Sequence, residues 1–164
     1  MAKKGNKQKP SMARRSGPAG ARNQSALEAL MTSVEDLMNR GDDAAALAAL
    51  ETALPRLGHY AEVRALLATL LGQRGRYMAA VRHARVAVDL RPGFPGYHAL
   101  LAMSYWYAGF YSLAYRTHRT YQKLDPQGSV QFPISREIET VQLAALDGIA
   151  ERYGLAGRRV ADEA

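Results

Sequence analysis

The chain has 164 residues, of which 48% are hydrophobic and 23% are charged, a composition typical of one globular domain with its own core. It contains no cysteine, which excludes disulfide scaffolds, thiolate zinc sites and cysteine nucleophiles. The formal net charge of +7 comes from residues 1–26, which hold seven basic and no acidic side chains, because the 15 basic and 15 acidic residues of 27–164 cancel.

Residues 1–26 are predicted to be a disordered basic tail, because a segment so poor in apolar side chains cannot offset the entropy lost on ordering. No apolar stretch of the kind found in secretory signals follows the basic start, so a cytoplasmic protein without membrane contact is expected. The tail is either a solubilising arm or a weak, nonspecific binder of polyanions such as nucleic acid. The cations available for that binding are Lys3, Lys4, Lys7, Lys9, Arg14 and Arg15.

A 34-residue repeat follows the tail and divides the chain into registers 27–60, 61–94 and 95–128. Several columns recur at this interval. They read Gly41, Gly75 and Gly109; Ala46, Ala80 and Ala114; Val34, Ala68 and Ala102; and Ala53, Ala87 and Tyr121. A single column could arise by chance, but four columns at one period indicate a repeated structural unit.

Each register is predicted to be a helical hairpin. The glycine ends the first helix in a left-handed conformation, which glycine adopts without strain. The alanines allow the two antiparallel helices to approach closely, and Pro92 and Pro126 stop the second helices. No stretch alternates apolar and polar residues with a period of two, so the fold class is all-α.

This pattern resembles the tetratricopeptide-repeat (TPR) family over residues 27–128, most clearly in the second and third registers. The resemblance implies a right-handed α-α superhelix, a solenoid of three helical hairpins. The first register departs from the family pattern, with Val34 where a small residue is usual and Asp43 where an aromatic residue is usual. The family's tryptophan-like column is missing in all three registers, and reads Leu30, Arg64 and His98.

After residue 128 the repeat signature ends, and a longer helix over about 135–153 is predicted to cap the exposed end of the stack. Ile138, Val141 and Ala145 begin its apolar face. The predicted domain therefore covers 27–153, and residues 154–164 are expected to be a short flexible end.

The first helices of TPR hairpins line a concave groove, and the resemblance implies that a protein segment binds there. Nine of the 13 aromatic residues lie between Phe94 and Tyr121, which favours the third register as a binding surface. The family members that grip the acidic carboxyl termini of heat-shock chaperones use Lys and Asn in these columns, which this chain lacks, so that role is not expected. The predicted groove residues are Met31, Glu35, Met38, Thr69, Gln73, Met103, Trp106 and Tyr107.

A basic band occupies the second register, which holds six basic and two acidic side chains. The band is either a solvated face, a platform for an acidic partner, or a surface on which the acidic first register of another copy stacks. Its members are Arg74, Arg76, Arg82 and Arg85.

No catalytic, metal-binding or cofactor-binding motif accompanies the repeat, so an enzyme is not expected. His118 falls in a helix-packing column and is interpreted as a core residue. The leading functional hypothesis is a protein-protein interaction adaptor. An RNA- or ribosome-associated protein recruited by its basic tail, a secretion-chaperone-like protein and a fragment of a longer repeat protein remain as alternatives.

Overall fold

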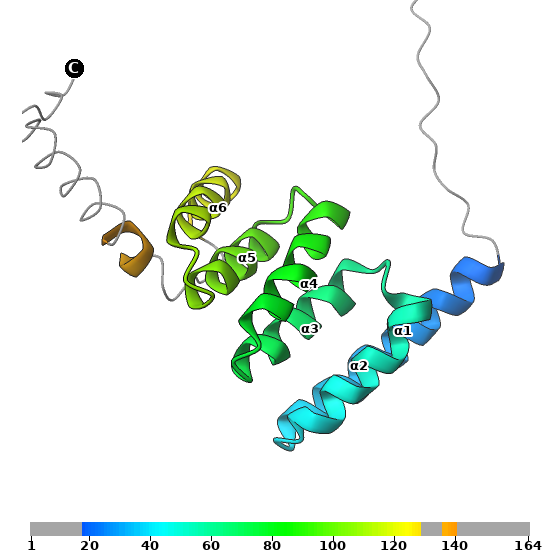
Figure 1. Ribbon diagram of the computed structural model, residues 1–164. Helices are drawn as coiled ribbons and strands as arrows, with labels where there is room; N and C mark the ends of the chain where they lie inside the picture. Colours follow the sequence, from blue (N-terminus) through cyan, green and yellow to red (C-terminus); the bar gives the residue numbers. More distant parts are fainter. Residues whose placement is uncertain (1–17, 129–135, 141–164) are drawn as a thin grey trace, which may run out of the picture.

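The computed structural model describes residues 18–128 and 136–140, and these residues contain helices and no strand (Figure 1), so the prediction of an all-α fold is confirmed. Residues 136–140 form a further helical stretch. The six longer helices are α1 (Pro18–Asn39), α2 (Asp43–Leu57), α3 (Ala61–Gln73), α4 (Tyr77–Leu90), α5 (Pro95–Tyr107) and α6 (Tyr111–Leu124).

The helices pack as three hairpins, α1 with α2, α3 with α4, and α5 with α6, which follow one another side by side in chain order (Figure 1). Neighbouring hairpins are joined by contacts of α2 with α3, of α4 with α5 and of α3 with α5. Helices α2, α4 and α6 begin at residues 43, 77 and 111, and the 34-residue interval seen in the sequence is therefore the interval of the structure.

The turn inside each hairpin is built around the repeated glycine. The φ angles of Gly41, Gly75 and Gly109 are +74°, +72° and +81°, as the sequence predicted. In the second hairpin the amide of Gly75 donates to the Gly72 carbonyl at 3.0 Å, and the amide of Arg76 donates to the Leu71 carbonyl at 2.9 Å. The same two hydrogen bonds recur in the other two hairpins, so the three turns share one geometry.

Small buried side chains set the distance between the helices. Ala46, Ala80 and Ala114 have no exposed surface, and the column of Val34, Ala68 and Ala102 is buried as well. Larger apolar side chains fill the space around these contacts and form the main core. The bulkiest fully buried leucines are Leu50, Leu67, Leu70 and Leu71.

The residues in the missing tryptophan column have another role. The Arg64 Nε–H donates to the Gly58 carbonyl at 2.7 Å, and the His98 Nε2–H donates to the Pro92 carbonyl at 2.8 Å. Gly58 and Pro92 are themselves 34 residues apart, so the two hydrogen bonds occupy equivalent places. Each one ties the connection between two hairpins to the first helix of the following hairpin.

The boundary of the predicted tail differs from the structure, because α1 begins at Pro18 and residues 18–26 are helical. Proline is favoured at the start of a helix, where its missing N–H is not needed. The Arg56 side chain holds this extension by donating from Nε to Asn23 Oδ1 at 3.0 Å and from a terminal nitrogen to the Arg22 carbonyl at 3.3 Å. The six cations proposed to bind polyanions lie in residues 1–17, outside the described residues.

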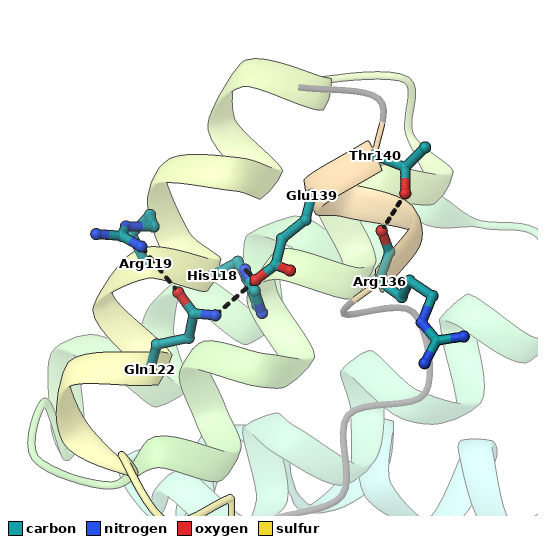
Figure 2. Close-up of polar contacts among 6 residues, drawn as sticks. All are labelled: His118, Arg119, Gln122, Arg136, Glu139 and Thr140. Atoms are coloured by element: carbon teal, nitrogen blue, oxygen red, sulfur yellow. Dashed lines mark hydrogen bonds and ion pairs between the residues drawn. The ribbon is translucent and has the colours of Figure 1, made fainter. Parts of the chain in front are cut away.

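Of the predicted capping helix over about 135–153, residues 136–140 are described, and they are helical and pack against the last hairpin. Ile138 is 1% exposed, in a cluster with Ala102 and Ala114. Figure 2 shows the polar side of this contact, in which the Gln122 amide donates to Glu139 Oε1 at 2.6 Å. The rest of the predicted helix and residues 154–164 lie outside the described residues.

His118 is fully buried on α6, which agrees with its interpretation as a core residue, and its Nδ1 lies 3.9 Å from Glu139 Oε1 (Figure 2). Burial lowers the pKa of the His118 imidazole below its ordinary value of 6.5. The Glu139 carboxylate raises this pKa and the Arg119 guanidinium lowers it, and the net direction is downward.

Acidification is therefore expected to destabilise the protein. The unfolded chain protonates His118 near its ordinary pKa, whereas the folded chain resists protonation, so the free energy of unfolding falls as the pH drops from about 7 to 5. In urea titrations across this pH range, His118→Gln is expected to reduce the slope of the free energy of unfolding against pH by up to about 1.4 kcal/mol per pH unit. An unchanged slope in this variant would contradict the prediction.

Candidate functional site

The main candidate site is a pocket of about 420 Å³ between α3 and α5, called here the α3–α5 pocket. It is open to the surface, and no charged side chain is among the described residues that line it. A concave, mostly apolar lining with a few polar groups is typical of binding sites. Its lining residues are Ala68, Thr69, Gly72, Gln73, Tyr77, Leu100, Met103, Ser104 and Tyr107.

The hydroxyl groups of Thr69 and Ser104 in this lining are directed to their own helices. The Thr69 hydroxyl donates to the Ala65 carbonyl at 3.0 Å, and the Ser104 hydroxyl donates to the Leu100 carbonyl at 2.8 Å. Because these donors are already used, the inner wall of the pocket presents mainly methyl, methylene and thioether groups. An apolar side chain is therefore the ligand group that this wall fits best.

Two of the lining residues are stacked tyrosines. The rings of Tyr77, at the start of α4, and Tyr107, at the end of α5, lie 5.6 Å apart between centroids with an interplanar angle of 20°. Tyr107 remains 50% exposed, so part of this residue is accessible from outside. Stiff, amphipathic rings of this kind carry much of the binding energy in protein interfaces.

A second pocket of about 310 Å³ lies between α1 and α3, and is called here the α1–α3 pocket. Glu35 in this pocket and Thr69 and Met103 in the α3–α5 pocket occupy the same repeat column. The two pockets therefore lie on equivalent faces of the three first helices. The α1–α3 pocket is lined by Met31, Val34, Glu35, Met38, Asn39 and Leu66.

The predicted groove residues thus fall into two groups and one exception. Met31, Glu35 and Met38 line the α1–α3 pocket, whereas Thr69, Gln73, Met103 and Tyr107 line the α3–α5 pocket.

The exception is Trp106, which is among the lining residues of neither pocket. Its indole packs edge-on against Tyr111 at 5.0 Å and joins the cluster that contains Ile138. The chain's own α6 and residues 136–140 therefore cover part of the surface that this ring was predicted to offer to a partner.

Sequence reasoning missed several lining residues, and helical spacing contained the signal for most of them. Gly72 lies three residues after Thr69, and Leu100 lies three residues before Met103, so each shares a helix face with a predicted residue. Tyr77 is the first residue of α4, and it lies beside the end of α5 in the next hairpin. Helical spacing within one helix does not reveal this contact.

The four arginines of the predicted basic band do not lie on one surface feature: two line a pocket and two lie outside it. Arg76 and Arg82 line a third depression of about 430 Å³, called here the arginine pocket, together with Tyr77, Met78 and Tyr107. The Arg76 guanidinium lies 4.0 Å from Glu51 Oε1, a distance too long for a hydrogen bond. Arg74 and Arg85 are exposed and lie outside this lining.

Residues 18–128 and 136–140 contain neither a candidate metal site nor a candidate membrane-spanning helix. No group of three or more His, Asp or Glu side chains in these ranges could hold a metal ion. No helix within the same ranges is both long enough and apolar enough to cross a membrane.

No family model and no curated protein matches the sequence. Among solved structures, the second TPR domain of human RPAP3 in complex with the HSP70 peptide SGPTIEEVD is similar to this chain, with a TM-score of 0.65 and 14% sequence identity. The match covers 71% of this chain and 98% of that domain. The TPR domain of Sgt2 from Aspergillus fumigatus has a TM-score of 0.63 and 16% identity over 84% of this chain and 87% of that one.

A third similar structure is a mutant of the O-GlcNAc transferase from Thermobaculum terrenum, with a TM-score of 0.60 and 26% identity over 65% of this chain. This chain spans 20% of the length of the transferase. The three similarities concern the helical-hairpin architecture, which is shared across proteins of very different size.

Proposed function

Since the chain folds as a tetratricopeptide-repeat domain, we propose that it is an adaptor that binds a polypeptide segment of a partner protein. The segment lies across the first helices, α1, α3 and α5, and places an apolar side chain in the α3–α5 pocket. The similar RPAP3 domain holds a peptide, which supports this mode of action.

The uncharged lining of the α3–α5 pocket is the observation that carries the proposal. Its leucine, methionine and tyrosine side chains offer contacts to apolar groups and no cation to a carboxylate. Among its described lining residues, the α1–α3 pocket adds the acidic Glu35 and no cation. A partner is therefore held mainly by an apolar anchor, and gripping of a terminal carboxylate in these pockets is not part of the proposal.

Selection from a displayed library of random 12-residue peptides tests this function. The selected peptides are expected to share an apolar residue, and Tyr107→Ala is expected to weaken their binding at least about tenfold, measured by fluorescence anisotropy. Loss of the ring removes one wall of the pocket and half of the stacked tyrosine pair.

Tyr111→Ala is the matched control, because Tyr111 is also a tyrosine and is also 50% exposed, but does not line the pocket. Its binding is expected to stay near that of the parent. A library that yields no enriched peptide, or two variants that bind equally well, would refute the proposed function.

A further inference from the structure

The α3–α5 pocket and the arginine pocket are direct neighbours. Tyr77 and Tyr107 belong to the linings of both, so the stacked tyrosine pair is the wall that separates the two depressions. A ligand that places a side chain in one pocket and continues over the edge of the tyrosines reaches the other. The two surfaces can therefore be contacted by one short peptide.

The chemistry differs sharply on the two sides of this wall. The α3–α5 pocket has no charged residue among its described lining, whereas the arginine pocket holds Arg76 and Arg82 and, within the same described set, no acidic residue. The lining of the arginine pocket includes the first turn of α4, whose peptide dipoles add positive potential there. An anionic group is favoured on this side and an apolar group on the other.

The existing partner of Arg76 holds its guanidinium only weakly. Arg76 and Glu51 are both more than half exposed on their side chains, and an exposed pair at 4.0 Å contributes little to stability. A guanidinium has five N–H donors, and it binds a carboxylate in a two-pronged geometry that the distant Glu51 does not use. A ligand carboxylate can thus approach Arg76 and Arg82 without breaking a strong contact.

We infer that the preferred ligand of the groove is an internal peptide segment in which an apolar residue is followed or preceded at short spacing by Asp or Glu. The apolar side chain occupies the α3–α5 pocket, and the carboxylate pairs with Arg76 and Arg82 beyond the tyrosine wall. This inference rests on the proposed function and specifies the chemistry of its ligand.

The spacing in the ligand follows from backbone geometry. In an extended peptide, residues two apart point to the same side and lie roughly 6.6 Å apart. In a helical peptide the corresponding spacing is three or four residues. The position of the acidic residue relative to the apolar one therefore reports the conformation of the bound segment.

The test uses a random 12-residue library displayed as an internal segment, so that no peptide has a free terminal carboxylate. Sequencing of the bound fraction is expected to show Asp and Glu enriched about fivefold over Asn and Gln at one fixed spacing from an apolar residue. In the double variant Arg76→Gln, Arg82→Gln this ratio is expected to fall to about one, while the apolar enrichment remains.

The matched control is Arg74→Gln, Arg85→Gln, which removes the same charge from exposed members of the basic band outside the arginine pocket. This control is expected to retain most of the acidic preference. An acidic preference that survives in the Arg76, Arg82 variant, or disappears equally in both double variants, overturns the inference. Apolar enrichment without any acidic preference overturns it too but leaves the proposed function intact, whereas no enrichment at all refutes both.

Discussion

Replacing Leu70 by alanine is expected to lower the free energy of unfolding by about 3 kcal/mol. Leu70 has no exposed surface and lies in α3, the helix that contacts α4, α2 and α5. Removing its side chain loses apolar burial and leaves a cavity in the middle hairpin. Because each hairpin of a solenoid is stabilised mainly by its neighbours, the loss weakens both junctions of the stack.

Urea denaturation followed by circular dichroism measures this effect, with Leu90→Ala as the matched control. Leu90 lies at the end of α4 and is 40% exposed, so its truncation is expected to cost less than about 1 kcal/mol. Equal losses in the two variants would contradict the prediction that burial of Leu70 in the core contributes strongly to stability.

The hairpins could be predicted from the sequence because their determinants are local and repeated. Each turn requires a residue that adopts positive φ, and each helix pair requires a small residue between its helices. These requirements select glycine and alanine at positions that recur every 34 residues. Gly75 and Ala80 are such residues, and their structural roles agree with the roles predicted from the columns.

The residues that replaced the tryptophan column could not be interpreted in the same way. Arg64 and His98 differ in size and charge, yet both donate to an equivalent carbonyl in the preceding connection. The role they share is to donate a hydrogen bond to that carbonyl, and the residue type alone does not reveal which group a side chain contacts. The start of α1 was missed for a related reason, because Arg56 fixes it from another helix.

The groove was predicted as a face, but its division into pockets depends on contacts between helices. Met103 and Trp106 are three residues apart on α5, and periodicity placed both on the same surface. In the structure Met103 lines the α3–α5 pocket, whereas Trp106 packs against Tyr111 and the cluster of Ile138. Packing of Trp106 against α6 and residues 136–140 therefore leaves Tyr107 as the more exposed of these two neighbouring aromatic residues.

Enlarging a single alanine tests the close approach of helices on which the groove depends. Ala80 has no exposed surface, and a Cβ atom added at Gly72 on α3 would lie 3.9 Å from the Ala80 Cβ atom. The two helices thus meet at small residues, and Ala80→Leu is expected to lower the free energy of unfolding by about 2 kcal/mol or more. Because Gly72 also lines the α3–α5 pocket, displacement of α3 is expected to weaken peptide binding in the same variant.

The control is Ala48→Leu, at an exposed position of α2, which is expected to change the free energy of unfolding and the peptide affinity little. If Ala80→Leu has the same stability and affinity as Ala48→Leu, then close packing at this position does not hold the groove in shape.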